Sequence, residues 1–332
     1  MAGTIIFTGA NGSLGLYAVE HLLTKYPEHT ALLTVRNATD ADPNTGKLRD
    51  LIARFPNTKA TIYQVDLSRL SDVHDFATVV AEQVESNKLP RIIGIVCNAF
   101  YWNLVGGPDM TVDGFEKSFA VSHVAHVALV LRLIGLFSPD GGRVTLLSSD
   151  AHYPGKNPTE RIPPVIPEDL DLLPKPSATK GDTFGLGYQR YANSKLALTT
   201  WMYALNSHLE KDSNLRNVTA IALHPGALVD SRSLRTNAPG YLRIAQTLVL
   251  RPFLPILRLQ NPTYRKARDA GVDTMELALG KIHPGERGYF VCRDPDESAP
   301  QSRDDEVQEK LWAKSAEWAG ITEDKTALKL NS

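Results

Sequence analysis

Short apolar runs recur along the chain and are separated by longer stretches in which apolar residues follow helical spacing. Each run holds five or six residues rich in Val, Ile, Leu and Thr, which is typical of a strand buried on both faces. Strands that alternate with helices predict an α/β fold built on a doubly wound parallel sheet. About seven strands are expected, at residues 4–8, 31–35, 61–65, 92–96, 143–147, 218–223 and 288–292.

Helical patterns follow most of these strands. After the first strand, apolar residues recur three or four positions apart at Leu16, Val19, Leu22 and Leu23, which places them on one face of a helix. Further helices are expected at about 71–86, 111–137 and 191–211, and an amphipathic helix carrying Val307, Leu311 and Trp318 closes the pattern.

Charge and cysteine content exclude several classes of protein. The 332 residues carry a net charge of -1, so no nucleic-acid footprint is present. Cys97 and Cys292 make neither a disulfide framework nor a metal site, and a reduced, cytoplasmic protein is expected. No basic leader precedes the first strand, and no run of eighteen apolar residues predicts a membrane span.

A glycine-rich turn directly follows the first strand. Gly9, Gly12 and Gly15 lie between that strand and the first helix, which is the setting in which a backbone approaches a dinucleotide pyrophosphate. Arg36 follows the second strand, where an acid would bind ribose hydroxyls and an arginine suits a 2′-phosphate. The sequence therefore favours NADP(H) as the cofactor.

Tyr191 and Lys195 are candidates for proton transfer. They are four residues apart on a predicted helix, so the phenol and the ammonium share one face. An isolated phenol titrates near about 10, and a neighbouring cation lowers that pKa toward neutral pH. The pair is therefore suited to acid–base chemistry at a carbonyl group.

Residues 152–187 interrupt the alternation of strands and helices. Seven prolines fall between Pro154 and Pro176, and the segment is too long and irregular for an ordinary connection. We expect an excursion beside the active site, and a tolerated surface insertion is the alternative.

The stretch 241–259 is strongly apolar, but Arg251, Pro252 and Pro255 interrupt it, so it does not predict a spanning helix. A lid over an apolar substrate, covering about 231–265, is the first interpretation. A partner surface and a peripheral membrane contact are the alternatives.

These motifs, in this order, resemble the short-chain dehydrogenase/reductase family over nearly the whole chain. The resemblance rests on the Thr8–Gly15 turn, Asp66-Leu67, Cys97-Asn98-Ala99, Ser149, Tyr191 with Lys195, and Pro225-Gly226. The retinol-dehydrogenase and protochlorophyllide-reductase side of the family is the most similar, as indicated by 147–152, 191–196, 224–226 and 310–312. The resemblance implies one Rossmann-fold domain over 1–322, a tail at 323–332, and a place in secondary metabolism.

The resemblance also implies roles for individual residues. Ser149, Tyr191 and Lys195 would be catalytic: Tyr191 as the general acid or base, Lys195 holding the nicotinamide ribose and lowering the pKa of Tyr191, and Ser149 bonding the substrate oxygen. The cofactor would contact Gly9, Asn11, Ser13, Leu14 and Gly15 at the pyrophosphate, Arg36 at the 2′-phosphate, Asp66, Leu67 and Asn98 around the adenosine, and Pro225, Gly226 and Leu228 beside the nicotinamide. No metal is implied.

Three positions depart from the family pattern. Ser13 replaces the middle glycine of the turn, and Gly12 comes one position earlier, which also fits the spacing of extended members such as sugar epimerases. Ser122 stands where the family has a catalytic asparagine that supports the proton relay. Phe100 replaces a glycine and would narrow the site. Beyond these, His152, Tyr153 and Tyr188 are candidates for substrate contact.

The favoured function is therefore NADPH-dependent reduction of a carbonyl, or of an activated C=C bond, in a bulky apolar small molecule. The alternatives are an extended-type nucleotide-sugar epimerase or dehydratase, and a cofactor-bound protein that performs no redox step, such as a binding or cyclisation protein. The expected partners are the small-molecule substrate and a second copy in a homodimer.

Overall fold

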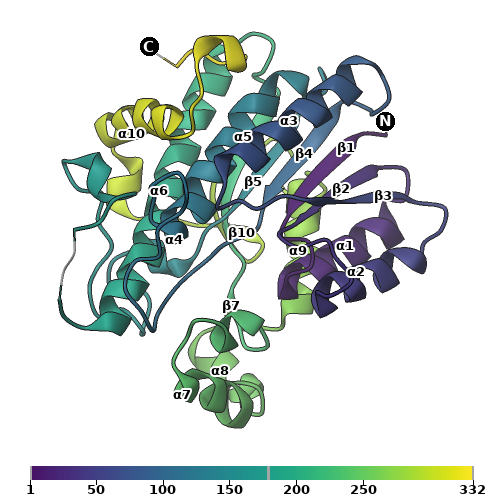
Figure 1. The fold of residues 1–332 in the computed structure, drawn as a ribbon. Coiled ribbons are helices and arrows are strands. Elements are labelled where there is room, and N and C mark those ends of the chain that lie inside the picture. The colour runs from purple at the N-terminus through teal and green to yellow at the C-terminus, as the bar shows by residue number, and fades with distance from the viewer. Residues whose placement is uncertain (1, 178–179, 331–332) are drawn as a thin grey trace.

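The computed structural model describes residues 2–177 and 180–330. Its centre is an eight-stranded sheet in the order β10-β9-β6-β5-β4-β1-β2-β3 (Figure 1). Neighbouring strands are parallel except β9 and β10. The strands are β1 Thr4–Thr8, β2 Thr30–Val35, β3 Lys59–Gln64, β4 Ile92–Cys97, β5 Gly142–Leu147, β6 Val218–His224, β9 Gly288–Val291 and β10 Asp294–Pro295. The predicted doubly wound sheet and its seven strands are confirmed, and β10 is an addition at the edge.

Strand order brings the expected site residues to one edge of the sheet. β1 pairs with β2 on one side and with β4 on the other, so the order of the strands reverses between β1 and β4. The carboxyl ends of parallel strands meet at such a point and leave a crevice for a ligand. The turn after Thr8 and the residues after Cys97 therefore adjoin, and β5 and β6 end beside them.

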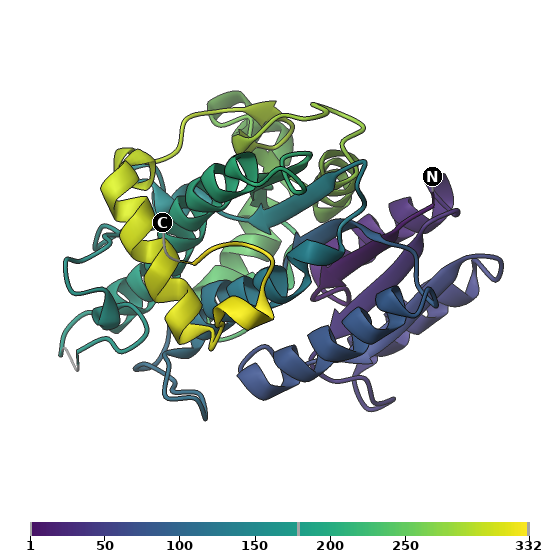
Figure 2. The same ribbon diagram turned by 90° about the horizontal axis from the view of Figure 1, so that it is seen from above.

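Helices cover both faces of the sheet (Figure 2). One face carries α1 Ser13–Lys25, α2 Pro43–Ala53 and α9 Ala267–Ala278, and the other carries α3 Leu70–Glu85, α5 Ala125–Leu133 and α6 Thr183–Lys211. The patterns predicted neither α2 nor α9. A Cβ at Gly271 would lie 2.7 Å from the Ala18 backbone nitrogen, so glycine permits the close packing of α9 on α1.

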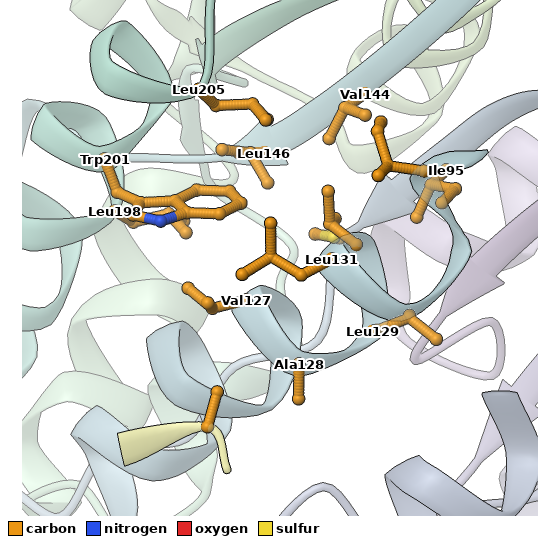
Figure 3. Packing of buried hydrophobic residues seen from close by; sticks show 14 of the residues in the cluster. Ile95, Val127, Ala128, Leu129, Leu131, Val144, Leu146, Leu198, Trp201 and Leu205 are labelled. Carbon is orange, nitrogen blue, oxygen red and sulfur yellow. The ribbon is translucent and has the colours of Figure 1, made fainter. Parts of the chain in front are cut away.

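The larger core lies between β5, α5 and α6. Figure 3 shows Val127, Leu131, Leu198 and Trp201 around Leu146 of β5, and all of these side chains are fully buried. Trp201 stacks on Trp312 of α10 (Asp305–Trp318), with ring centroids 5.7 Å apart, and Trp312 stacks on His208 at 4.1 Å. The closing amphipathic helix is therefore confirmed, and α10 lies over α6.

The long apolar helix begins at Lys117 and not at about 111. The side chain of Glu116 accepts a hydrogen bond from the Phe119 amide and caps the start, and Gly114 has a φ of +78° that a helix does not allow. The helix comprises α4 Lys117–Phe119, a π-helical turn Ala120–Val124, α5, and a 3-10 turn Ile134–Leu136. Among the described residues, Lys117–Leu136 is the one stretch long and apolar enough to cross a membrane, and 78% of it is buried inside the protein, as expected of a core helix.

Residues 231–265, here called the lid lobe, project from the body of the protein below the sheet (Figure 1). Parallel pairing of β7 Ala227–Leu228 with β8 Tyr264–Arg265 closes the base of the lobe. The buried ion pair of Arg265 with Asp273 ties this base to α9. The helical elements of the lobe are a 3-10 turn Arg232–Arg235, α7 Gly240–Ala245, a π-helical turn Gln246–Leu250 and α8 Leu254–Gln260.

The proline-rich segment 152–187 winds along α6 and α10. In its first half, Asn157 Nδ2 donates a hydrogen bond to the Asp150 carboxylate at 2.9 Å. In its second half, the Asp171 carboxylate accepts a hydrogen bond from Trp318 Nε1 at 2.9 Å. Residues 178–179 of this segment and 331–332 of the expected tail lie outside the described residues. Leu328 and Leu330 of the tail are buried in the larger core. The remaining 3-10 turns are Asp150–His152, Leu170–Leu172, Pro300–Arg303 and Glu323–Lys325.

Candidate active site

The glycine turn between β1 and α1 has the shape of an anion cradle. Gly9 has a φ of +65°, and a Cβ at Gly15 would lie 2.7 Å from the carbonyl oxygens of Gly9 and Ala10. The N-cap of α1 is Gly12, which has no side chain to accept from the first amides, and the first turn carries no acid. Within the described chain, these amides and the helix dipole therefore face the crevice without a capping side chain, which fits a pyrophosphate.

Asn98 joins the end of β4 to this turn. Its side-chain amide donates to the carbonyls of Thr8 at 2.9 Å and Gly9 at 3.2 Å, and its backbone amide donates to Thr8 Oγ1 at 2.9 Å. Asn11 is also held, because its Nδ2 donates to Thr45 Oγ1 at 2.9 Å and to Asp42 at 3.2 Å. Both asparagines thus shape the cradle, and Leu14 is buried beneath it.

The residues expected around the adenosine lie at the ends of β2 and β3. Arg36 directly follows β2 and is exposed to solvent. Asp66 follows β3 and accepts hydrogen bonds from the amide and hydroxyl of Ser68, and Leu67 is buried beside it. A cation open to solvent at this position can meet a 2′-phosphate.

Helix α6 and the end of β5 bring Ser149, Tyr191 and Lys195 together. Lys195 is buried, and its Nζ donates to the Leu147 carbonyl at 2.6 Å and lies 5.7 Å from the Tyr191 ring centroid. Ser149 caps the 3-10 turn after β5, where its hydroxyl accepts from the Ala151 amide at 3.2 Å, and it is also hydrogen-bonded with Tyr191.

Burial shifts the pKa of both titratable groups. It raises the pKa of Tyr191 above the ordinary value, and the hydrogen bond of Ser149 opposes this shift without reversing it. Burial also lowers the pKa of Lys195 to about 7, because the charged amine is removed from water. The expected lowering of the Tyr191 pKa is therefore not found in this structure: the desolvation of the phenol outweighs its favourable interactions.

Aromatic side chains surround Tyr191. Its ring centroid lies 5.4 Å from Trp102, 5.8 Å from Phe100 and 6.1 Å from Tyr188. Phe100 also lies 5.5 Å from Lys195 Nζ, so this departure from the family pattern places a ring beside both Tyr191 and Lys195. Leu104, Ala151, Phe184 and Ala192 complete a small apolar cluster, against which Ala238 and Leu242 of the lid lobe pack.

Ser122 lies in the π-helical turn, which widens the helix. Its hydroxyl is fully buried and has no hydrogen-bond partner among the described residues, while its carbonyl accepts from His126 Nδ1 at 3.2 Å. His126 Nε2 lies 3.0 Å from Thr8 Oγ1. This arrangement connects Ser122 to the glycine turn.

His152 is held by hydrogen bonds at both ring nitrogens and supports the backbone of the site. Its Nδ1 donates to the Ser149 carbonyl at 2.6 Å, its Nε2 accepts from the Ala299 amide at 3.1 Å, and burial lowers its pKa to about 4. Both ring nitrogens are thus engaged, and the neutral ring holds Ser149 in place. Tyr153 packs on His152, with Lys156 over its ring, so of the three extra candidates Tyr188 is the one that packs on Tyr191.

After β6, Pro225 and Gly226 turn the chain into the lid lobe. Gly226 has a φ of +93°, and a Cβ there would lie 2.5 Å from the Thr263 carbonyl, so the turn requires glycine. Leu228 follows in β7 and packs against the core under the glycine turn. These three residues border the crevice beside the end of β5.

Arg232 is a site residue that the sequence analysis missed. Its backbone amide donates to Ser13 Oγ at 3.0 Å, and its guanidinium donates to the Asn11 carbonyl. The serine that replaces a glycine in the turn thus binds the lid lobe. Asp150 was also missed: its carboxylate accepts from Ser149 at 3.0 Å, and its charge adds to the burial that raises the pKa values of Tyr188 and Tyr191. Arg232 belongs to no local motif, and Asp150 lies in the 147–152 motif, which was used only for the family resemblance.

Comparison with known proteins agrees with this geometry. A family profile described as the AcuH dehydrogenase domain matches residues 232–328. The dehydrogenase acuH of Aspergillus aculeatus is 42% identical over 92 residues, which are 28% of this chain and 94% of that protein. The short-chain dehydrogenase iccH of Talaromyces variabilis is 26% identical, with 98% of both chains covered. The chain belongs to the short-chain dehydrogenase/reductase family.

Human retinol dehydrogenase 13 is 27% identical over 96% of this chain and 85% of its own length, so the expected side of the family is confirmed. The solved short-chain dehydrogenase from Burkholderia cenocepacia in complex with NADP superimposes with a TM-score of 0.58 at 17% identity, covering 87% of this chain and 96% of that chain. At this identity the likeness shows the fold. The chain is thus an oxidoreductase of the short-chain dehydrogenase/reductase family.

Proposed function

We propose that this short-chain dehydrogenase/reductase uses NADPH to reduce a carbonyl group, or an activated C=C bond, in a bulky apolar substrate. The observation that carries the proposal is the setting of Tyr191. Its phenol is hydrogen-bonded with Ser149, lies one helical turn from Lys195, and is enclosed by aromatic and aliphatic side chains beneath the lid lobe.

The glycine cradle and the exposed side chain of Arg36 favour NADPH as the cofactor. Gly9, Gly15 and the amides of Ser13 and Leu14 would hold the pyrophosphate, Arg36 the 2′-phosphate, and Asp66, Leu67 and Asn98 the adenosine side. Pro225, Gly226 and Leu228 would border the nicotinamide, and Lys195 would hold its ribose. When bound, NADPH supplies the hydride that reaches the substrate carbon. The related Burkholderia cenocepacia enzyme was solved in complex with NADP, which supports this cofactor here.

The residues of the chain would move one proton. Burial raises the pKa of Tyr191, so its phenol stays protonated at neutral pH and can donate to the substrate oxygen as charge develops there. Ser149 would donate a hydrogen bond to the same oxygen. Lys195, with a pKa of about 7, can exchange a proton near neutral pH and so restore Tyr191. In the reverse direction Tyr191 would act as the base.

The substrate class follows from the walls of the site. Trp102, Phe184, Tyr188 and Leu242 offer aromatic and aliphatic contacts next to Tyr191, and these favour a ring-bearing or polyene molecule over a sugar. Retinoid-like, steroid-like and polyketide-like ketones or aldehydes fit this description. The name of human retinol dehydrogenase 13 is consistent with the first of these classes.

We also propose that residues 1–322 form one domain around this site. Homodimer pairing through the helices after β4 and β5 would use the outer sides of α5 and α6, but α10 and Leu328 pack on this part of the protein. Sedimentation velocity of the full chain distinguishes a monomer from a dimer.

The test is NADPH oxidation against a panel of apolar ketones, aldehydes and enones, with wild type beside Tyr191→Phe. We expect turnover in the wild type and a loss of at least two orders of magnitude in kcat for the variant, as acid–base catalysis alone contributes roughly 10²–10⁴-fold. NADPH affinity should remain close to that of the wild type. Equal turnover by both proteins would contradict the assigned role of Tyr191, and NADPH binding without oxidation of any substrate would favour a non-redox function.

A further inference from the structure

Exposed large hydrophobic side chains are concentrated in the lid lobe. Among the described residues, fifteen large hydrophobic side chains are exposed, and seven of them fall within residues 241–259. Leu259 is 86% exposed and Leu248 is 64% exposed. The seven side chains are those of Tyr241, Ile244, Leu248, Val249, Phe253, Ile256 and Leu259. Soluble monomers rarely leave such a cluster uncovered without a partner.

The same segment is strongly basic. Residues 231–268 contain eight Arg or Lys residues and no Asp or Glu, although the whole chain has 36 basic and 37 acidic residues. Six of the eight are exposed: Arg235, Arg243, Arg251 and Arg258 in the lid lobe, and Lys266 and Arg268 directly after it. Asp269 forms an ion pair with Arg258 at 3.4 Å, and Glu20 and Asp230 lie beside Arg251 at the base of the lobe. The lobe thus combines exposed apolar side chains with a net positive charge, although the whole chain has a net charge of -1.

The inner face of the lid lobe closes over the catalytic residues. Ala238 and Leu242 pack against the cluster that contains Tyr191. Residues 102–104 and 236–237 are joined by three hydrogen bonds: Trp102 Nε1 to the Thr236 carbonyl at 3.0 Å, the Leu104 amide to the Asn237 carbonyl at 2.8 Å, and Asn237 Nδ2 to the Trp102 carbonyl at 3.3 Å. One thin lobe therefore separates Tyr191 from the exposed apolar face.

We propose that the outer face of the lid lobe binds the surface of an anionic membrane and that the apolar substrate reaches Tyr191 from that membrane. This inference rests on the proposed function for the identity of the substrate, but the binding surface stands on its own observations. Apolar side chains enter the boundary between headgroups and acyl chains, and the arginines and lysines around them attract anionic headgroups.

Charge decides between a membrane and a second copy of the chain. Two copies that met through this face would bring the exposed arginines and lysines of both copies together, and like charges at an interface oppose association. An anionic bilayer provides the opposite charge and an apolar interior at the same time. The two helices, α7 and α8, are too short to span it, so the contact is peripheral.

The test is co-sedimentation of the full chain with vesicles of phosphatidylcholine alone and of phosphatidylcholine mixed with phosphatidylserine. We expect binding to the mixed vesicles, weaker binding to phosphatidylcholine alone, and release at high salt. Arg243→Gln with Arg258→Gln should weaken binding by roughly fivefold for each charge removed. Leu248→Ser with Leu259→Ser should weaken it by on the order of tenfold or more. The matched control is Leu172→Ser, which changes an exposed leucine outside the lobe.

No binding by the wild type, or equal binding by wild type and both double variants, would overturn the proposal. Equal binding to the two kinds of vesicle would overturn the anionic preference. A dimer in sedimentation velocity that the Leu248 and Leu259 substitutions dissociate, without vesicle binding, would assign the face to self-association instead. NADPH oxidation with water-soluble ketones is measured separately, so failure of the catalytic proposal and failure of membrane binding give different results.

Discussion

The guanidinium of Arg232 donates a hydrogen bond to the backbone carbonyl of Asn11, and these residues are 221 positions apart in the sequence. The contact places a cation of the lid lobe directly on the turn that would hold the pyrophosphate. Gln246, which is fully buried, supports this position: its Nε2 donates to the Ser231 carbonyl at 2.6 Å and its Oε1 accepts from Arg235 at 2.6 Å.

Arg232→Ala should weaken NADPH binding. A charge-assisted hydrogen bond contributes about 1.5–3 kcal/mol, which corresponds to roughly a 10- to 100-fold increase in the Kd for NADPH. Fluorescence titration of NADPH measures this, and Arg268→Ala, at an exposed position on α9, is the control. An unchanged or lower Kd in Arg232→Ala would mean that Arg232 only latches the lobe to the turn and leaves it when the cofactor binds.

Asn237 should control the opening of the lid lobe. It has a φ of +51°, where asparagine and glycine are tolerated and alanine is strained by roughly 1–2 kcal/mol. Asn237→Ala should therefore increase the open population and the rate of tryptic cleavage at the lobe arginines by roughly 5- to 30-fold, and raise KM for an apolar substrate. Asn237→Gly, which loses the same side-chain hydrogen bond to Trp102 without that backbone strain, is the control. Equal cleavage rates in Asn237→Ala and wild type would show that this contact does not limit opening.

Lys195 should make the stability of the protein depend on pH. Its pKa is lowered from the ordinary 10.5 to about 7 in the folded protein, so between these values the unfolded chain binds a proton that the folded chain does not. The stability contribution of Lys195 therefore rises with pH from about 7 toward 10 and is least favourable below pH 7. The difference in Tm between wild type and Lys195→Met, measured without cofactor from pH 6.5 to pH 9.5, should shift in favour of the wild type.

The difference in Tm between wild type and Lys195→Met removes the contributions of titratable groups that both proteins share. Burial raises the pKa of Cys97, which destabilises the folded protein above about pH 8.5, but Cys97 is present in both proteins. A constant difference in Tm across this range would mean that the amine stays charged in the folded protein.

Trp312 should be the main anchor of α10. It is fully buried and stacks between Trp201 and His208, so Trp312→Ala leaves a large cavity and should lower the free energy of unfolding by about 3–5 kcal/mol. Chemical denaturation measures the loss. Leu172→Ala, at a partly exposed position, should change stability by less than about 1 kcal/mol. A small effect of Trp312→Ala would indicate that α10 contributes little to the core.

For the lid lobe, the local sequence pattern predicted an apolar segment but not its role. The apolar residues from Tyr241 to Leu259 indicated a lid, a partner surface or a membrane contact, since composition alone cannot say which side of a helix faces the protein. The tertiary structure separates two faces: Leu242 and Leu254 turn inward, and most of the other large apolar side chains remain in solvent. Helix α9 was missed for a related reason, because small residues such as Gly271 give little periodic signal although they allow close packing.

The sequence by itself determined the parallel sheet, the glycine cradle and the Tyr191–Lys195 pair, because each depends on residues close together in the chain, on continuous apolar runs and on the helical period of 3.6 residues. Only the tertiary structure decided that burial raises the pKa of Tyr191 and lowers that of Lys195, that His152 is a neutral support for Ser149, and that Arg232 meets Asn11. Desolvation and contacts between distant segments depend on how the whole chain packs, and no local spacing encodes them.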